Sequence, residues 1–293
     1  MHPLDEFRGF VKADEPLAPL TWFRLGGVAD FLARPQTIDE LRSLVLCCHK
    51  EAIPFRVLSS GSNVLVGDKG VRGVVIQLES PAFSDVRIDG RTVEAGAAVP
   101  LNALISQTAR AGLAGLELLT GIPGSVGGAL RGNAGSRQTA LGQFVQSVTV
   151  LDRHGDTVTR ERDDLSFSYR WSNLDDPIIL AARFSLELED PEAVVRRMRR
   201  IWIVKKENQP YGHQLSGLIF KDPATDIAAR MLIDQSGLKG ARVGGAEVSD
   251  RDSNYIVAQS GASAADVMGL IDLIRETVKT QTGHNLELQI QIW

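Results

Sequence analysis

The sequence has very little cysteine. Its 293 residues include only two, Cys47 and Cys48, and these are adjacent. Adjacent cysteines cannot form the framework of a disulfide-stabilised fold, which favours a reducing compartment. With no further cysteine and with scattered histidines, the pair also lacks the partners of a zinc site. We therefore expect no bound metal, and both cysteines are interpreted as small apolar residues of a helix.

The sequence also lacks long apolar runs and a positive net charge. Runs such as VVIQL and LIDLI are far too short to span a bilayer, and MHPLDEFRGF has none of the features of a signal peptide. The formal net charge of −4 gives no overall field that would recruit nucleic acid. These absences predict a cytoplasmic protein that binds neither membrane nor nucleic acid.

The composition that remains is that of a globular protein. A hydrophobic content of 43% and a charged content of 23% are ordinary for such chains, and the length allows about two domains or more. Strand patterns dominate before residue 190 and helical patterns become more prominent after it. We predict an α+β fold with divisions near residues 80 and 190, which gives domains 1–80, 81–190 and 191–293.

Several local signals define individual elements. Thr37 and Glu40 form a predicted capping box for a helix that follows. Asp89-Gly90 and the region of His154 are expected at hairpin turns. Pro191 is expected at the first position of a basic amphipathic helix. Further helices are predicted over 226–236 and from Ser263 to Gly283, and LELQIQIW is predicted to be a final strand whose residues alternate between two faces.

Two glycine-rich segments are the first functional signals. Residues 59–63 read SSGSN between two predicted strands, and residues 121–135 read GIPGSVGGALRGNAG. Successive backbone N–H groups in such turns can bind an anion. Neither segment is a GxGxxG that opens a helix or ends in GK[ST], which argues against Rossmann and P-loop sites. Two tight turns are the simpler interpretation, but two such loops in one strand-rich region favour a bound dinucleotide or diphosphate.

These segments resemble those of a known family. SSGSNVLV followed by GVRGVVIQL, the TWFRLGG segment at residues 21–27 and GIPGSVGGALRGNAG are similar to its flavin-binding motifs. FSYRWS at 167–172 resembles its FxYRxS segment, and GGAEVS at 244–249 resembles GGxxVS. The match runs nearly end to end. On these motifs the chain is identified as a member of the UDP-N-acetylenolpyruvoylglucosamine reductase (MurB) family of peptidoglycan synthesis.

The resemblance implies an FAD-binding fold of the vanillyl-alcohol-oxidase (PCMH) type with a C-terminal α/β substrate-binding domain. It implies non-covalent FAD, NADPH as the hydride source, a UDP-sugar as the substrate, and a monomer or weak dimer. Cofactor contacts are implied for Ser59, Ser60, Gly61, Ser62, Asn63, Val64, Gly121, Ile122, Pro123, Gly124, Ser125, Gly127, Gly128, Asn133 and Gly135. Substrate contacts are implied for Tyr169, Lys221 and Asn254.

The resemblance also assigns catalytic positions, and here the chain departs from the family. Family members use an arginine and a glutamate to stabilise an enol-like anion, and a serine or cysteine to protonate it. Arg170 matches the arginine. Leu218 stands at the serine or cysteine, and Gln289 stands at the glutamate. In addition, Asp222, Asp252 and Ala258 occupy positions of a family asparagine, histidine and asparagine.

Three sources of the missing proton are open. Ser216 and Glu287 each lie two residues from the substituted positions, which is roughly 6–7 Å along a strand. Water is the third source. Loss of a proton donor typically lowers a rate roughly 10²–10⁴-fold.

Three functions follow from these substitutions. The chain is predicted to be a working reductase that makes UDP-N-acetylmuramate with altered proton delivery. Alternatively, it is an FAD-binding paralogue without reductase activity that acts as a binding or regulatory protein. As a third alternative, the apolar pair Leu218-Ile219 would suit an FAD oxidoreductase that acts on another sugar or alcohol.

Overall fold

The structure is a computed structural model that describes residues 3–208, 210, 216–224 and 226–293. The chain divides into two compact units, each assembled from separate stretches of sequence. The first unit comprises Met1–Asp14, Phe31–Ser59 and Arg72–Val204, and the second comprises Glu15–Asp30, Ser60–Val71 and Lys205–Trp293. This division into two units does not test the boundaries predicted near residues 80 and 190, so the three-domain organisation stays a prediction.

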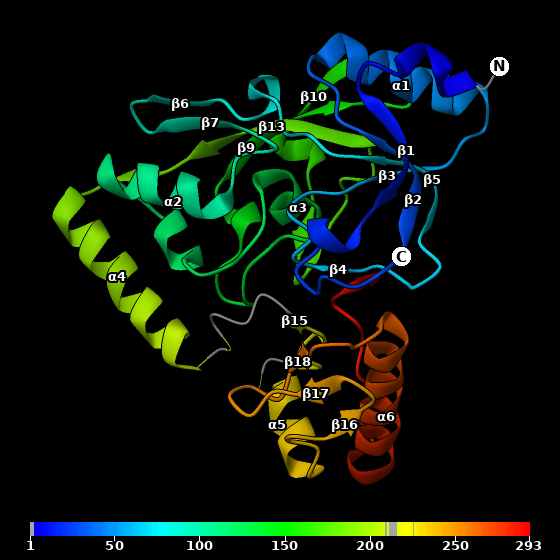
Figure 1. Ribbon diagram of the computed structural model, residues 1–293. Helices are drawn as coiled ribbons and strands as arrows, with labels where there is room; N and C mark the ends of the chain where they lie inside the picture. Colours follow the sequence, from blue (N-terminus) through cyan, green and yellow to red (C-terminus); the bar gives the residue numbers. More distant parts are fainter. Residues whose placement is uncertain (1–2, 209, 211–215, 225) are drawn as a thin grey trace. The chain divides into compact units, whose positions relative to one another are not determined.

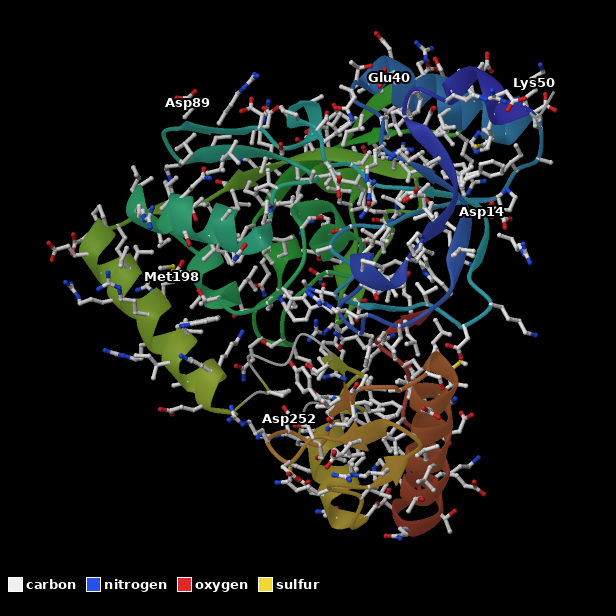
Figure 2. All side chains as sticks on the ribbon, viewed as in Figure 1. Asp14, Glu40, Lys50, Asp89, Met198 and Asp252 are labelled. Atoms are coloured by element: carbon white, nitrogen blue, oxygen red, sulfur yellow. The ribbon has the colours of Figure 1, made fainter. Side chains whose placement is uncertain are left out.

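The first unit is built on a five-stranded antiparallel sheet. Its strand order is β10-β9-β13-β7-β6, and α3 (Val126–Arg131) packs against β13 and β7 (Figure 1). Gly90 has a φ of 57°, as the tight turn of the predicted hairpin requires, and Asp89 lies at the tip of that hairpin (Figure 2). The strands are β6 (Val86–Asp89), β7 (Thr92–Gly96), β9 (Val145–Leu151), β10 (Thr157–Glu161) and β13 (Ile178–Ser185). Both predicted hairpins are confirmed.

A second sheet has the order β1-β2-β5-β3. Its strands are β1 (Val11–Pro16), β2 (Val28–Ala33), β3 (Phe55–Val57) and β5 (Val71–Ile76). The neighbouring helix α1 (Ile38–Lys50) begins as predicted, because the Thr37 side chain accepts a hydrogen bond from the Glu40 N–H at 3.1 Å. The Glu40 carboxylate, however, accepts from the Gln36 N–H at 2.6 Å. Only half of the predicted capping box is therefore present, and Glu40 and Lys50 mark the two ends of the helix (Figure 2).

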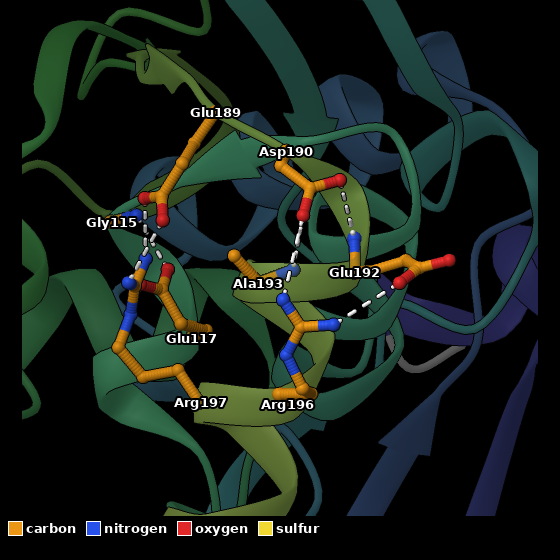
Figure 3. A network of polar contacts seen from close by, with 8 residues as sticks. All are labelled: Gly115, Glu117, Glu189, Asp190, Glu192, Ala193, Arg196 and Arg197. Atoms are coloured by element: carbon orange, nitrogen blue, oxygen red, sulfur yellow. Dashed lines mark hydrogen bonds and ion pairs between the residues drawn. The ribbon is translucent and has the colours of Figure 1, made fainter.

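A polar network fixes α4 (Pro191–Asn208) to the first unit (Figure 3). The Asp190 carboxylate accepts hydrogen bonds from the N–H groups of Glu192 and Ala193, at 3.2 and 3.1 Å, so the helix begins at the predicted Pro191. Further along α4, Arg197 contacts the carboxylates of Glu117 and Glu189 at 2.7 and 2.8 Å. Glu117 is only 1% exposed, and its carboxylate also accepts a hydrogen bond from the Gly115 N–H, so this buried group is satisfied within the network.

Short elements complete the first unit. They are η1 (Pro3–Phe7), η3 (Pro81–Phe83), α2 (Leu101–Arg110), β8 (Leu113–Ala114), η4 (Leu116–Leu119), η5 (Leu141–Gln143), η6 (Arg162–Asp164), β11 (Phe167–Ser168), β12 (Trp171–Ser172) and β14 (Glu187–Leu188). The apolar face of α2 packs into the core of the five-stranded sheet through Leu101, Leu104 and Ile105.

The second unit combines an antiparallel sheet with two helices (Figure 1). The sheet has the order β15-β18-β17-β16, and α6 contacts β16 and β17. A complete capping box starts α6, between Ser263 and Asp266, and Gly283 ends it with a φ of 76°. The elements are η2 (Ala18–Leu20), β15 (Ser216–Leu218), α5 (Ala229–Gln235), β16 (Arg242–Val243), β17 (Ala246–Val248), β18 (Tyr255–Ala258) and α6 (Ala264–Thr282). The predicted 226–236 helix is therefore three residues shorter at its start and one at its end.

The prediction for LELQIQIW is largely wrong. Only β19 (Gln291–Ile292) is a strand, and it pairs in parallel with β4 (Val64–Leu65). Before that point the backbone pairs elsewhere, because the Gln289 N–H donates to the Ile219 carbonyl at 2.8 Å. A change of partner along the segment prevents one continuous strand with alternating faces. The strands β3 and β4 are present as predicted, but they belong to different sheets.

Within the described residues, no helix combines the length and the apolar character needed to cross a membrane. The same part of the chain contains no cluster of three or more His, Cys, Asp or Glu side chains that could hold a metal ion.

Candidate active site

The first glycine-rich segment presents backbone donors. Gly61 has a φ of 65°, and a Cβ there would lie 2.3 Å from the Leu20 carbonyl oxygen, so only glycine fits. No hydrogen bond from the N–H groups of residues 59–63 occurs within the described ranges. Consecutive unpaired amides in a turn are the donors of an anion-binding nest. No acidic side chain occurs in residues 59–64, so the segment suits the diphosphate of a dinucleotide.

The TWFRLGG segment donates hydrogen bonds to carbonyl groups of this loop and of the residues that follow it. The Trp22 N–H donates to the Gly61 carbonyl at 3.1 Å, and the Gly27 N–H donates to the Gly67 carbonyl at 3.0 Å. Thr21 is buried beside the loop. Within the described residues, positions 21–27 therefore fix the loop through its carbonyl groups and leave the N–H groups of residues 59–63 free of bonds to this segment.

The second glycine-rich segment lies in the first unit together with Ser59. The Ser59 hydroxyl donates to the Ser125 hydroxyl at 2.7 Å, so the first residue of the nest meets the 121–135 loop. Gly121, Gly124 and Gly135 have φ values of 84°, 119° and 151°, which explains why these three positions of the motif are glycine. A Cβ on Gly127 would lie 2.9 Å from the Ala97 side chain, so α3 approaches β7 closely.

Asn133 of the same motif has a structural role. Its side chain donates to the Ser168 carbonyl at 2.7 Å and accepts from the Gly142 N–H at 2.9 Å, and it is 4% exposed. Both ends of the carboxamide are thus used by the backbone. The asparagine of the NAG triplet ties the 121–135 loop to the hairpin that carries Arg170.

Arg170 occupies a tight turn between β11 and β12. Its φ of 57° is unusual for a residue with a side chain, and such strain concentrates at functional sites. Its Nε is buried and has no hydrogen-bond partner in the described part of the chain. The ring of the preceding Tyr169 lies 4.0 Å from the guanidinium carbon of Arg137. A buried donor without a partner indicates a place for a ligand acceptor.

Three segments of the second unit bring the other predicted positions together. Ser216 and Leu218 lie in β15, which pairs with β18 through Val257 and Tyr255. The Lys221 N–H donates to the Glu287 carbonyl at 2.9 Å. Residues 216–221, 253–257 and 287–290 are therefore neighbours.

The side chains on these segments differ greatly in surroundings. Ser216 is 4% exposed, whereas the Glu287 side chain is 78% exposed and pairs with Lys221 at 3.6 Å. The carboxamide of Asn254 is bonded to both the N–H and the carbonyl of Phe220, at 2.9 Å each, so it fixes the 219–221 backbone. In contrast, Oε1 of Gln289 is buried without a partner in the described residues.

Asp222 and Asp252, which the resemblance places at two substituted positions, both accept hydrogen bonds from the backbone. Asp222 accepts from the Ala229 N–H at 2.9 Å and so satisfies the start of α5. Asp252 accepts from the Asn254 N–H at 3.0 Å, and burial raises the pKa of its carboxyl group. Both aspartates thus organise the backbone around the predicted substrate-binding residues.

Sequence reasoning missed two sets of contacts. The Asp68 carboxylate accepts from the N–H groups of Ala264 and Ala265, at 2.9 and 3.0 Å, and so fixes the start of α6 to the loop that follows the nest. The Asn63 side chain donates to the Gln289 carbonyl at 3.0 Å. Partners this far apart along the chain leave no periodic signal in the sequence.

Comparisons with known proteins agree with this arrangement. Residues 29–160 match the family model described as FAD binding domain, and residues 209–293 match UDP-N-acetylenolpyruvoylglucosamine reductase, C-terminal domain. The reductase of that name from Heliobacterium modesticaldum is 39% identical over 289 residues, covering 98% of this chain and 92% of its own. The Rhodopseudomonas palustris protein is 40% identical over 290 residues, covering 98% and 93%.

A solved structure gives the same result for the fold. The crystal structure of the Thermus caldophilus reductase (MurB) has a TM-score of 0.82 and 35% identity, and the match covers 97% of this chain and all of that one. The predicted fold class is therefore confirmed. On the motifs, the two domain matches and the full-length likeness, this chain belongs to the UDP-N-acetylenolpyruvoylglucosamine reductase family.

Proposed function

We propose that the chain binds FAD non-covalently and uses NADPH to reduce the enolpyruvyl group of UDP-N-acetylglucosamine enolpyruvate to UDP-N-acetylmuramate. The observation that carries the proposal is the position of its unpaired buried atoms. In the described residues three buried side-chain polar atoms have no partner, and two of them are Arg170 Nε and Gln289 Oε1. These are the two positions that the family uses to stabilise its intermediate.

The residues of the nest fit the diphosphate of FAD. Residues 59–64 would hold it with backbone N–H groups and with the hydroxyl groups of the three serines. Ser125 would complete the donors contributed by the 121–135 loop. When bound, the flavin supplies hydride chemistry that no side chain of the protein can provide.

Arg170 is the residue to which we assign charge stabilisation. A guanidinium stays protonated at all physiological pH values, and its fixed planar donors suit a developing enolate oxygen. The turn and the buried Nε hold the group in place before the reaction, so little reorganisation is required. Tyr169 and Lys221 supply contacts for the substrate, and Asn254 orients the backbone beside Lys221.

Protonation is the step for which the chain has the weakest machinery. Leu218 has no transferable proton, and the amide of Gln289 can donate a hydrogen bond but is not an acid. The Glu287 side chain is largely exposed to solvent, and Ser216 is buried in β15. Water is therefore the proton source that we propose, with a slower reaction as the consequence.

The decisive test is a stopped-flow measurement of the half-reaction in which the pre-reduced flavoprotein meets the UDP-enolpyruvyl sugar. Substrate-dependent reoxidation under anaerobic conditions is expected, at a rate that family members with an intact serine and glutamate exceed. Reduced protein that stays reduced at saturating substrate would contradict the proposal.

One alternative has its own support, because Leu218 and Gln289 together fit a binding protein that has lost the reductase reaction. Isothermal titration of the oxidised flavoprotein with the UDP-enolpyruvyl sugar separates the two functions. Tight binding without turnover would favour the binding protein, and turnover would exclude it.

A further inference from the structure

The segment 289–293 lies along the flavin-binding loop of the second unit. The Gln291 N–H donates to the Asn63 carbonyl at 3.0 Å, and the Trp293 N–H donates to the Leu65 carbonyl at 2.9 Å. The Gly67 N–H in turn donates to the Trp293 carbonyl at 2.8 Å. These contacts make residues 289–293 a second support of the loop, in addition to the TWFRLGG segment.

Together the two supporting segments donate hydrogen bonds to every second carbonyl group of the loop from residue 61 to residue 67. Those of Gly61 and Gly67 accept from the TWFRLGG side, and those of Asn63 and Leu65 accept from residues 291 and 293. A carbonyl and the N–H of the following residue share one rigid plane and point in opposite directions. Each carbonyl group that is fixed by a hydrogen bond therefore fixes the N–H of the next residue, which points away from the segment that donates the bond.

The amides oriented in this way are those of the predicted flavin contacts. The bond to Gly61 fixes the direction of the Ser62 N–H, and the bond from Gln291 to Asn63 fixes that of the Val64 N–H. The Asn63 side chain adds a further bond to the Gln289 carbonyl at 3.0 Å. The same short segment thus bears the position of the family glutamate and orients part of the nest.

We infer that residues 289–293 are a positioning element of the FAD site, which fixes Asn63 and aligns the Val64 amide at the end of the 60–64 turn before the diphosphate binds. Preorganised donors lose less conformational entropy on binding, so the element raises FAD affinity without touching the cofactor. The inference rests on the FAD binding proposed above. It also predicts coupling in the other direction, because bound FAD must hold the 289–293 segment in place.

Two proline substitutions test the inference as a matched pair. Gln291→Pro removes the N–H that donates to Asn63, whereas Ile292→Pro removes an N–H that points to the opposite edge of the strand. The binding of FAD to deflavinated protein can be followed by the quenching of FAD fluorescence. We expect the Kd for FAD of Gln291→Pro to be about three- to tenfold higher than that of the unmodified chain. The Kd of Ile292→Pro should remain within about twofold of the unmodified chain. Equal Kd values in the two variants would overturn the inference.

Hydrogen exchange of the unmodified chain gives an answer that does not depend on how the variants fold. Amides of the peptide that contains residues 289–293 should exchange more slowly when FAD is added, whereas those of the hairpin turn 153–156 in the first unit should not change. Unchanged exchange of the 289–293 peptide at saturating FAD would refute the coupling. A chain that does not bind FAD at all would refute the proposed function itself and the inference with it.

Discussion

Gln289→Glu restores an acid at a site that is prepared to keep it protonated. Glutamate is nearly isosteric with glutamine, and Oε1 of Gln289 is buried without a donor in the described residues. A carboxylate in that place would lack compensation for its charge, so burial should raise its pKa above the ordinary value of about 4.3. Because the side chain of residue 289 as a whole is only partly buried, we expect the pKa of the new carboxyl group to rise by about two, which is less than the rise of roughly 3–5 at full burial.

A carboxyl group with a pKa of about 6 is an effective proton donor near neutral pH. The rate of substrate-dependent NADPH oxidation should therefore rise, by up to roughly 10²–10⁴-fold if protonation limits turnover. The gain should fade as pH increases through the raised pKa, because the ionised group has no proton to give. Steady-state rates measured from pH 5 to pH 9 provide the check. The control is Gln281→Glu at an exposed position of α6, which should give neither the gain nor the pH dependence.

Stability measurements test the same reasoning independently of activity. A folded-state pKa raised above the unfolded value contributes stability that is present at low pH and is lost as pH rises through the folded pKa. A shift of about two units corresponds to about 2.7 kcal/mol. The free energy of unfolding of Gln289→Glu, relative to Gln281→Glu, should fall by about that amount between pH 4 and pH 8. A difference that is independent of pH would show that the surroundings of residue 289 do not raise the pKa of a carboxyl group.

Three further predictions address the proton donor, the α4 network and the start of α6. Introducing Leu218→Ser into the Gln289→Glu chain should increase single-turnover reduction of the substrate further, and by a larger factor than Leu218→Ser gives alone, because the two groups act together; no increase would assign protonation to another group. Arg197→Met should lower the free energy of unfolding in urea by about 2 kcal/mol, less than for a fully buried pair because the Arg197 side chain is 37% exposed. Adding Glu117→Gln should recover part of that loss, and a further loss would contradict the pairing. The pKa of Asp266 is held below its usual value by the N–H groups of Ser263 and Gly245. The advantage of the unmodified chain over Asp266→Asn should therefore be complete above about pH 4 and shrink towards pH 2 in thermal melts, and a constant difference would exclude the carboxylate as its source.

The sequence predicts the parts of the site that depend on local backbone geometry. Gly121, Gly124 and Gly135 are required by φ values that can be anticipated from a Gly/Pro pattern, and Gly61 is required by a contact that would exclude a Cβ. The helices that begin at Pro191 and Ser263 were likewise predictable, because their caps lie within a few residues. Local signals of this kind do not depend on the rest of the fold.

The parts that could not be predicted depend on partners far away in sequence. Nothing in LELQIQIW indicates that residue 289 pairs with residue 219 while residue 291 pairs with Asn63. The structural use of Asn133 and Asn254 was also hidden, since an asparagine in a motif looks the same whether it contacts a ligand or the backbone. In this chain, two asparagines that the motifs suggest as ligand contacts form hydrogen bonds with the backbone.

The pairing of β4 with β19 has a consequence for the synthesis of the protein. Residues 60–67 leave the ribosome early, but the strand that orients their carbonyl groups is translated more than two hundred residues later. At about 5–20 residues per second, the loop waits for roughly 10–45 s before it can be completed. Newly made chains should therefore bind FAD at full affinity only after residues 289–293 have been translated, and a nascent chain arrested upstream should need a higher FAD concentration to become yellow.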